Sequence, residues 1–164
     1  MPLVSITRLR VRTWRYVPQF LVQSLRAARQ AGRTPGNLAV SILRGADRVF
    51  WMRTLWRDEA AMRSFMRSGV HRRVMARLPK WCDEAALVHW VQQQSGPPSW
   101  PEAHRRLQGE GRRSRVIHPS EAQHRFEIRE PRRAAGRLSH DRGHRLVAAA
   151  FLASPTGFEP VLPP

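Results

Sequence analysis

Cysteine is almost absent from the 164-residue chain, since Cys82 is the only one. A disulfide within the chain is therefore impossible, and we expect a reducing, cytoplasmic location. No apolar run approaches the roughly 20 residues that a membrane-crossing helix needs. A strand-like pattern already begins at Leu3, so we expect no signal peptide. Apolar residues still make up 41% of the sequence, enough for a sizeable core. Together these features exclude a membrane protein, a disulfide scaffold and a wholly disordered chain.

Lysine is equally scarce, because Lys80 is the only one among 29 basic residues. The formal net charge of +17 would attract phosphates without regard to sequence. Selection for phosphate contacts, however, would not exclude lysine, which also binds phosphate. A GC-rich gene would exclude it, because arginine codons are mostly GC-rich and lysine codons are not. We therefore interpret the charge as solvated arginine and do not expect a nucleic-acid partner.

Hydrophobic periodicity divides the first part of the chain into strands and helices. Strand patterns cover residues 3–13, 37–43, 48–56 and 84–92, and helical patterns cover residues 16–31, 58–67 and 70–78. Asp58 is a good N-cap for the second helix, and Pro79 is expected to end the last helical piece. The order β-α-β-β-α-β predicts a ferredoxin-like α+β domain over residues 3–92, with the helices on one face of an antiparallel sheet.

The predicted strands are apolar on both faces. In residues 48–56, Trp51 and Leu55 point one way, while Phe50 and Trp56 point the other. A sheet with one wet face would alternate apolar and polar residues. Something must therefore cover the second face. A second copy of the same sheet, forming a homodimer, is the more economical cover, and a C-terminal helix folded back over the sheet is the alternative.

The composition changes after the fourth strand. Residues 93–110 are expected to form a linker and a short helix, with Ser99 as its cap. Residues 111–164 are rich in Arg and poor in apolar anchors, which predicts a mobile tail. The end of this tail, Gly157-Phe158-Glu159-Pro160, can be encoded by a sequence resembling the T-arm of a transfer-RNA gene. We therefore hypothesise that the last few dozen residues are read-through sequence, which the downstream nucleotide sequence would test.

Two segments resemble a known superfamily. The stretch LWRDEAAMRSFMRSGVH, residues 55–71, and the earlier Arg-Thr-Pro-Gly, residues 33–36, resemble the antibiotic-biosynthesis monooxygenase-like proteins, and within them bacterial relatives of spheroidene monooxygenase. The resemblance implies a dimeric α+β barrel over residues 3–92. That superfamily contains cofactor-free monooxygenases, haem-degrading enzymes and proteins without activity, so the resemblance is more specific for fold than for reaction.

Candidate chemistry centres on His71, which shares a helical stripe with Val74, Met75 and Leu78 and so faces inward. It is the candidate catalytic acid or base; the alternative is a buried, hydrogen-bonded structural histidine. The candidate substrate-binding residues are Phe20, Trp51, Trp56, Phe65, Met75, Trp90, Arg10, Arg53 and His89. Rings of this size suit an apolar polycyclic or isoprenoid ligand, and an inward arginine suits a carboxylate or enolate oxygen. The alternatives are core or interface packing for the rings and ordinary ion pairing for the arginines.

The cofactor is expected to be either none or haem. In the haem-degrading branch the resemblance implies an Asn on the first strand, a helical Trp and an axial His; here the first strand has no Asn, and the other two positions match Phe65 and Met75. No cluster of residues has the spacing of a metal site. Two functions remain open: monooxygenase-like oxidation of an apolar small molecule, and a non-catalytic dimeric barrel that binds a small ligand or acts as a structural subunit. A cavity that contains His71 and a further polar group would favour the enzyme.

Overall fold

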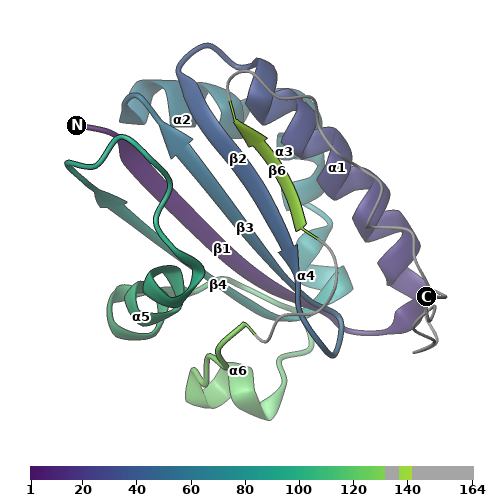
Figure 1. The fold of residues 1–164 in the computed structure, drawn as a ribbon. Helices are drawn as coiled ribbons and strands as arrows, with labels where there is room; N and C mark the ends of the chain where they lie inside the picture. Colours follow the sequence, from purple (N-terminus) through teal and green to yellow (C-terminus); the bar gives the residue numbers. More distant parts are fainter. Residues whose placement is uncertain (132–136, 142–164) are drawn as a thin grey trace, which may run out of the picture.

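The computed structural model describes residues 1–131 and 137–141. Its sheet has the strand order β5-β4-β1-β3-β2-β6, and every neighbouring pair is antiparallel. The strands are β1 (Leu3–Val11), β2 (Asn37–Arg44), β3 (Val49–Trp56), β4 (Cys82–Val91), β5 (Arg112–Arg113) and β6 (Arg137–Asp141). The helices are η1 (Trp14–Tyr16), α1 (Val17–Arg33), α2 (Glu59–Arg67), α3 (Gly69–Met75), α4 (Leu78–Trp81), α5 (Trp100–Glu110) and α6 (Glu121–Arg125). The predicted ferredoxin-like α+β order is therefore confirmed (Figure 1).

Local sequence signals explain most element ends. The Oδ1 atom of Asp58 accepts a hydrogen bond of 2.8 Å from the backbone N of Ala61, as expected for an N-cap. Ser68 separates α2 from α3, and Gly69, the first residue of α3, has a φ of +56°. Pro79 differs from the prediction, because it lies in the first turn of α4 and does not end a helix. A first-turn residue has no helical partner for its N–H, so proline is tolerated there.

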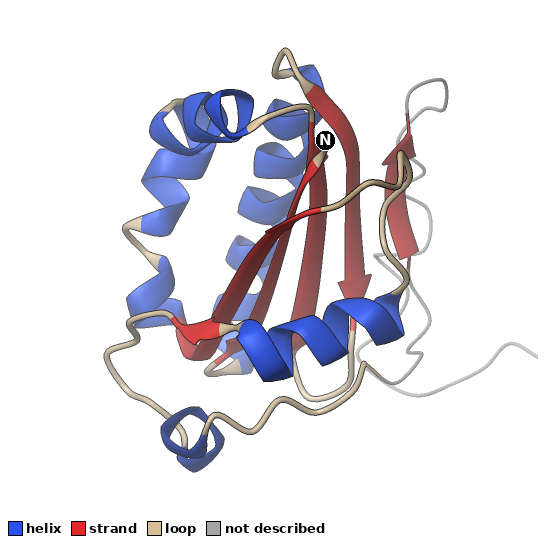
Figure 2. Ribbon diagram, turned by 90° about the vertical axis from the view of Figure 1, so that its left-hand side faces the viewer, coloured by secondary structure: helices blue, strands red, loops and turns tan. Residues whose placement is uncertain are grey.

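Two hydrophobic layers lie on opposite faces of the sheet. Helices α1 to α4 cover one face (Figure 2), and the core there includes Leu9, Phe20, Phe50 and Trp56. The second layer includes Val4, Ile6, Trp51 and Leu55, which alternate with the first set along the strands. The period of two in the sequence therefore assigned the side chains correctly to opposite faces.

The second face is covered within the single chain. Trp100, Ala103 and Leu107 of α5 pack against it, and Ala103 and Leu107 have no exposed surface. This packing is the alternative that we described, a C-terminal helix folded back over the sheet. A homodimer remains a prediction. Alternation along the strands revealed an apolar face but not which segment would bury it.

Residues 111–131 form a packed segment, unlike the mobile tail that we expected to begin at residue 111. The side chain of Gln123 on α6 is clamped to β4: its Oε1 accepts from the backbone N of Ala85 at 3.0 Å, and its Nε2 donates to the Ala85 O at 3.2 Å. The same Nε2 also donates to the backbone O of Ser114 at 3.0 Å. Hydrogen bonds thus hold this segment, which explains why its few apolar residues gave a misleading signal. The proposed read-through residues beyond 141 lie outside the described part of the chain.

No helix within residues 1–131 and 137–141 is both long and apolar enough to cross a membrane.

Candidate functional site

A cavity of about 330 Å³ lies between the helices and the sheet. Its helical wall includes Phe20 from α1, Met62 and Phe65 from α2, and Val74 and Met75 from α3. The sheet side is formed by β1 to β4, which turn the first of their two faces toward it. The wall is mainly apolar, and the volume is in the range of small-molecule sites.

The floor of the cavity contains a row of polar side chains. His89 on β4 is paired with Ser5 on β1, and Ser5 is paired with Thr54 on β3. All three residues line the cavity. Cross-strand partners on one face lie close together, so the three side chains form a continuous polar row across an otherwise apolar surface. Thr7, next on the same face of β1, adds another hydroxyl.

Few side-chain hydrogen bonds in the described part of the chain involve these polar groups. The Oγ1 atom of Thr54 accepts a hydrogen bond of 2.8 Å from the Nε1 of Trp56. None of the side-chain hydrogen bonds between described residues uses the hydroxyl of Ser5 or the ring of His89. The row can therefore donate to or accept from a bound molecule.

Burial lowers the pKa of His89 below the usual value of 6.5. The positive charge of Arg112 lowers that pKa further, and the negative charge of Glu59 opposes the shift. At neutral pH the ring is therefore uncharged and can accept a proton. The ring of His89 is therefore available as a proton acceptor on the floor of the cavity.

His71 faces the same cavity from α3. Burial lowers the pKa of its ring, whereas a hydrogen bond to the Met66 carbonyl raises it. Its Nδ1 lies 3.4 Å from that carbonyl oxygen, and its ring centroid lies 4.3 Å from that of Phe65. The backbone N of His71 donates to the Oε1 of Gln30 on α1 at 3.0 Å. These contacts fix the ring against the helical wall and support a structural role beside the chemical one.

The residues predicted as site candidates are divided between the two faces. Those that line the cavity are Phe20, Trp56, Phe65, His71, Met75 and His89. The other four, Trp51, Trp90, Arg10 and Arg53, belong to the opposite side of the sheet. There the guanidinium of Arg53 lies 4.4 Å above the Trp100 ring and donates to the Pro98 carbonyl. The opposite face is therefore a packed layer with α5.

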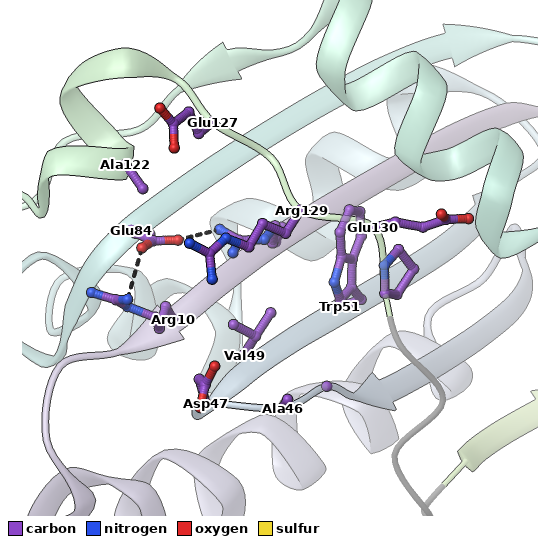
Figure 3. Close-up of a pocket in the computed structure, with 13 residues that line it drawn as sticks. Arg10, Ala46, Asp47, Val49, Trp51, Glu84, Ala122, Glu127, Arg129 and Glu130 are labelled. Atoms are coloured by element: carbon purple, nitrogen blue, oxygen red, sulfur yellow. Dashed lines mark hydrogen bonds and ion pairs between the residues drawn. The ribbon is translucent and has the colours of Figure 1, made fainter.

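A second pocket, of about 240 Å³, lies on this opposite side. Figure 3 shows Glu84 beside Arg10 there, with Arg129 and Glu127 nearby. The buried Glu84 carboxylate pairs with Arg8 at 2.6 Å and with Arg10 at 3.1 Å. Hydrogen bonding to Asp83 raises the pKa of Arg10. Charges of both signs neutralise one another within this pocket, so the arrangement is that of a structural ion-pair network.

Apart from His71 and His89, sequence reasoning missed the polar residues of the cavity, among them Ser5, Thr54, Arg112 and Arg115. The alternation of β1 already placed Ser5 on the same face as Leu9, so a signal for one of them existed. Thr54 becomes significant only through the register that aligns it with Ser5. The two arginines lie in the segment that we expected to be mobile.

Comparisons with known proteins agree with this architecture. The model of the family described as "Domain of unknown function (DUF3291)" matches residues 23–139. No curated protein matches the chain significantly.

Solved structures resemble it as well. A putative antibiotic biosynthesis monooxygenase from Nitrosomonas europaea is 17% identical, with a TM-score of 0.51 over 56% of this chain and 90% of its own. A conserved protein from Methanosarcina mazei is 14% identical, with a TM-score of 0.52 over 57% and 94%. A further antibiotic biosynthesis monooxygenase is 14% identical, with a TM-score of 0.51 over 56% and 99%. At these identities the resemblance establishes an antibiotic biosynthesis monooxygenase-like fold.

Proposed function

We propose that this chain, which belongs to the DUF3291 family, is a monooxygenase-like enzyme that oxidises an apolar small molecule in the cavity between helices and sheet. The observation that carries the proposal is the row of His89, Ser5 and Thr54 along the floor of an otherwise apolar cavity. A cavity with polar groups at one place can both hold an apolar frame and orient one reactive position on it.

The substrate class follows from the lining. Rings of Phe20, Trp56 and Phe65 suit a flat polycyclic frame or an isoprenoid chain. The similarity of residues 55–71 to relatives of spheroidene monooxygenase supports the isoprenoid option. To use the polar row, the frame must carry a phenol, an enol or a ring ketone, whose oxygen can accept from Ser5.

The reaction needs only a base and dioxygen. Neutral His89 removes a proton from an acidic CH₂ group that is conjugated with the ring ketone through the fused rings, and the resulting carbanion transfers electrons to dioxygen. A C–O bond forms, the peroxide takes up the proton, and loss of water leaves a new carbonyl. The balance is CH₂ + O₂ → C=O + H₂O, so dioxygen is the only oxidant. We assign the proton transfer to His89 in preference to His71, because the Met66 carbonyl and the Phe65 ring restrain His71.

The proposed reaction needs no cofactor. The residues of β1 that line the cavity are Ser5, Thr7 and Leu9, so this strand presents no Asn to it. Phe65 and Met75 occupy the cavity wall at the positions that the haem-degrading pattern gives to Trp and His. The cavity therefore does not fit that haem chemistry, and an absorbance spectrum without a Soret band is the expected result for the purified protein.

The binding unit in this proposal is the single chain in the cytoplasm. A homodimer through the second sheet face would have to displace α5, whose Leu107 is fully buried there. The cytoplasmic location rests on the single cysteine.

The experiment uses anthrone, a tricyclic ketone with an acidic CH₂ group, and an oxygen electrode. We expect enzyme-dependent oxygen uptake above the spontaneous rate, with one ¹⁸O atom from ¹⁸O₂ in the anthraquinone formed. His89→Gln should lower kcat/KM by about 10²–10⁴-fold, the usual contribution of a general base. His71→Gln should have a much smaller effect. His118→Gln, at an exposed histidine outside the cavity, is the matched control.

Two results would contradict the proposal. One is oxidation by His89→Gln at the rate of the unchanged protein. The other is anthrone binding without any turnover above the background, which would identify the non-catalytic ligand binder.

A further inference from the structure

Two arginines stand at the edge of the apolar cavity. Arg112 and Arg115 line it together with Ser114, and both arginines are exposed to solvent. They come from the segment that follows α5. This segment is not part of the β-α-β-β-α-β unit. Because the rest of the lining is apolar or neutral, these two guanidinium groups dominate the charge at the entrance.

Among the described residues, no Asp or Glu of the cavity lining and no ion pair compensates this charge. The described lining of the cavity contains neither Asp nor Glu. The ion pairs between described residues involve neither Arg112 nor Arg115. On exposed helix faces of the same chain, by contrast, arginines do find partners, such as Arg63 with Glu59 at 2.7 Å. The entrance is therefore positive toward whatever enters the cavity.

The segment that carries the arginines is held in place from both sides. The backbone N of Ser114 donates to the Ala85 carbonyl at 2.8 Å, and the backbone N of Ile117 donates to the Pro79 carbonyl at 2.8 Å. Residues 114–117 therefore run between β4 and α4, and Ala85 and Pro79 themselves line the cavity. Buried Gln123 adds its hydrogen bond to the Ser114 carbonyl. Two flexible side chains thus extend from an anchored backbone, which fixes where their charge acts.

The charge of Arg112 affects a residue inside the cavity. It lowers the pKa of His89 on the floor, as described above. Arg112 is also paired through its backbone with Leu87, two residues from His89 on the same face of β4. The entrance arginine and the floor histidine therefore belong to one continuous site.

We propose that the natural ligand is amphipathic, with an apolar frame inside the cavity and a carboxylate at its entrance, bound by Arg112 and Arg115. The inference rests on the proposed function, because the same cavity holds the apolar frame. Guanidinium groups form strong charge-assisted hydrogen bonds with carboxylates, often in a bidentate arrangement. The ligand is thus a polycyclic or isoprenoid carboxylic acid, and its acid group determines which end stays at the entrance.

The test compares two fluorescent probes that differ only at the proposed contact. Anthracene-2-carboxylate carries the negative charge, and 2-(hydroxymethyl)anthracene has the same three rings without it. Binding is followed by fluorescence anisotropy at low salt. We expect the carboxylate to bind about tenfold more tightly, the fold-change that one charge-assisted contact supplies. The difference should shrink as salt is added, because the arginines are exposed.

Variants then show which residues bind the carboxylate. Arg112→Gln with Arg115→Gln should bring the affinity for the carboxylate down to that for the alcohol, while the affinity for the alcohol stays unchanged. Arg113→Gln is the matched control, since Arg113 alternates with Arg112 in β5 and lies 5.8 Å from the Phe126 ring. It should leave both affinities unchanged.

The outcomes separate this inference from the proposed function. Equal binding of the two probes by the unchanged protein, or a preference that survives loss of both arginines, would overturn the carboxylate site and leave the apolar cavity intact. Absence of binding by either probe would overturn the cavity as an apolar site and the inference with it.

Discussion

His89 and Ser5 are cross-strand partners on β4 and β1, and both line the cavity between helices and sheet. This pairing places a base next to a hydroxyl group at the bottom of an apolar site. Neither residue is remarkable in isolation, and they are 84 positions apart in the sequence, from residue 5 to residue 89. The antiparallel register between the first and last strands of the ferredoxin-like unit brings them together.

The pKa of His89 should lie below 6.5, because burial and the charge of Arg112 both disfavour the imidazolium ion. Arg112→Gln should raise that pKa toward 6.5 without reaching it, since burial remains and Glu59 already acts in the opposite direction. Titration of the ring protons by NMR measures the value directly, and Arg113→Gln is the control. A value at or above 6.5 in the unchanged protein would show that the ring is not buried as described.

Stability should fall as the pH decreases through the range below about 6.5. His71 and His89 both have a lowered pKa in the folded chain. In this pH range the unfolded chain therefore binds more protons at these two residues than the folded chain does. Their contribution is fully present above the unfolded pKa and is lost as the pH falls toward the folded values. Urea midpoints at pH 7.5 and 5.5 measure the loss, which should be smaller in the His71→Gln, His89→Gln double variant. An equal loss in both proteins would assign it to other groups.

Gly36→Ala should destabilise the protein by about 1–3 kcal/mol, the range for a strained backbone position. Gly36 has a φ of +87°, and an added Cβ atom would lie 2.6 Å from the Cβ of Ala61 on α2. Its carbonyl also accepts from the backbone N of Arg57 at 2.8 Å. Denaturant unfolding measures the change. Gly45→Ala, where the nearest atom would lie at an ordinary 3.4 Å, is the control and should cost much less.

Leu107→Ala should cost about 2–5 kcal/mol, as expected for truncation of a fully buried leucine. Arg105→Ala on the exposed side of α5 should have little effect. Sedimentation of the unchanged protein should give the mass of one chain, because α5 already covers the second sheet face. A stable dimer that Leu107→Ala leaves intact, with no loss of stability, would show that α5 does not provide this cover.

Cys82 should resist thiol reagents while the protein is folded. The residue has no exposed surface, and burial together with the charge of Asp83 raises its pKa to about 12. At pH 8 only about one thiol in ten thousand is then ionised. Mass spectrometry after iodoacetamide treatment should show modification in concentrated guanidinium chloride but not in buffer. Rapid modification of the folded protein would mean that Cys82, at the start of β4, is accessible to solvent.

The sequence alone determined the β-α-β-β-α-β order over residues 3–92, the alternation of side chains along the strands and the capping of α2 by Asp58. These features depend on local geometry: a period of two along a strand, a period of 3.6 along a helix, and a side chain that reaches a nearby backbone N–H. Alternation could separate Trp51 from Trp56 but could not say which of them faces the helices, because both faces are equally apolar.

Only the tertiary structure decided what the site is. Strand register aligned His89 with Ser5 and Thr54, and the choice of face placed Trp51 and Trp90 under α5 and away from the cavity. The segment that bears Arg112 and Arg115 is held by hydrogen bonds to β4 and α4 and by a few dispersed apolar contacts, such as that of Val116. Such bonds join residues distant in sequence, so hydrophobic periodicity, which records only local neighbours, could not predict them.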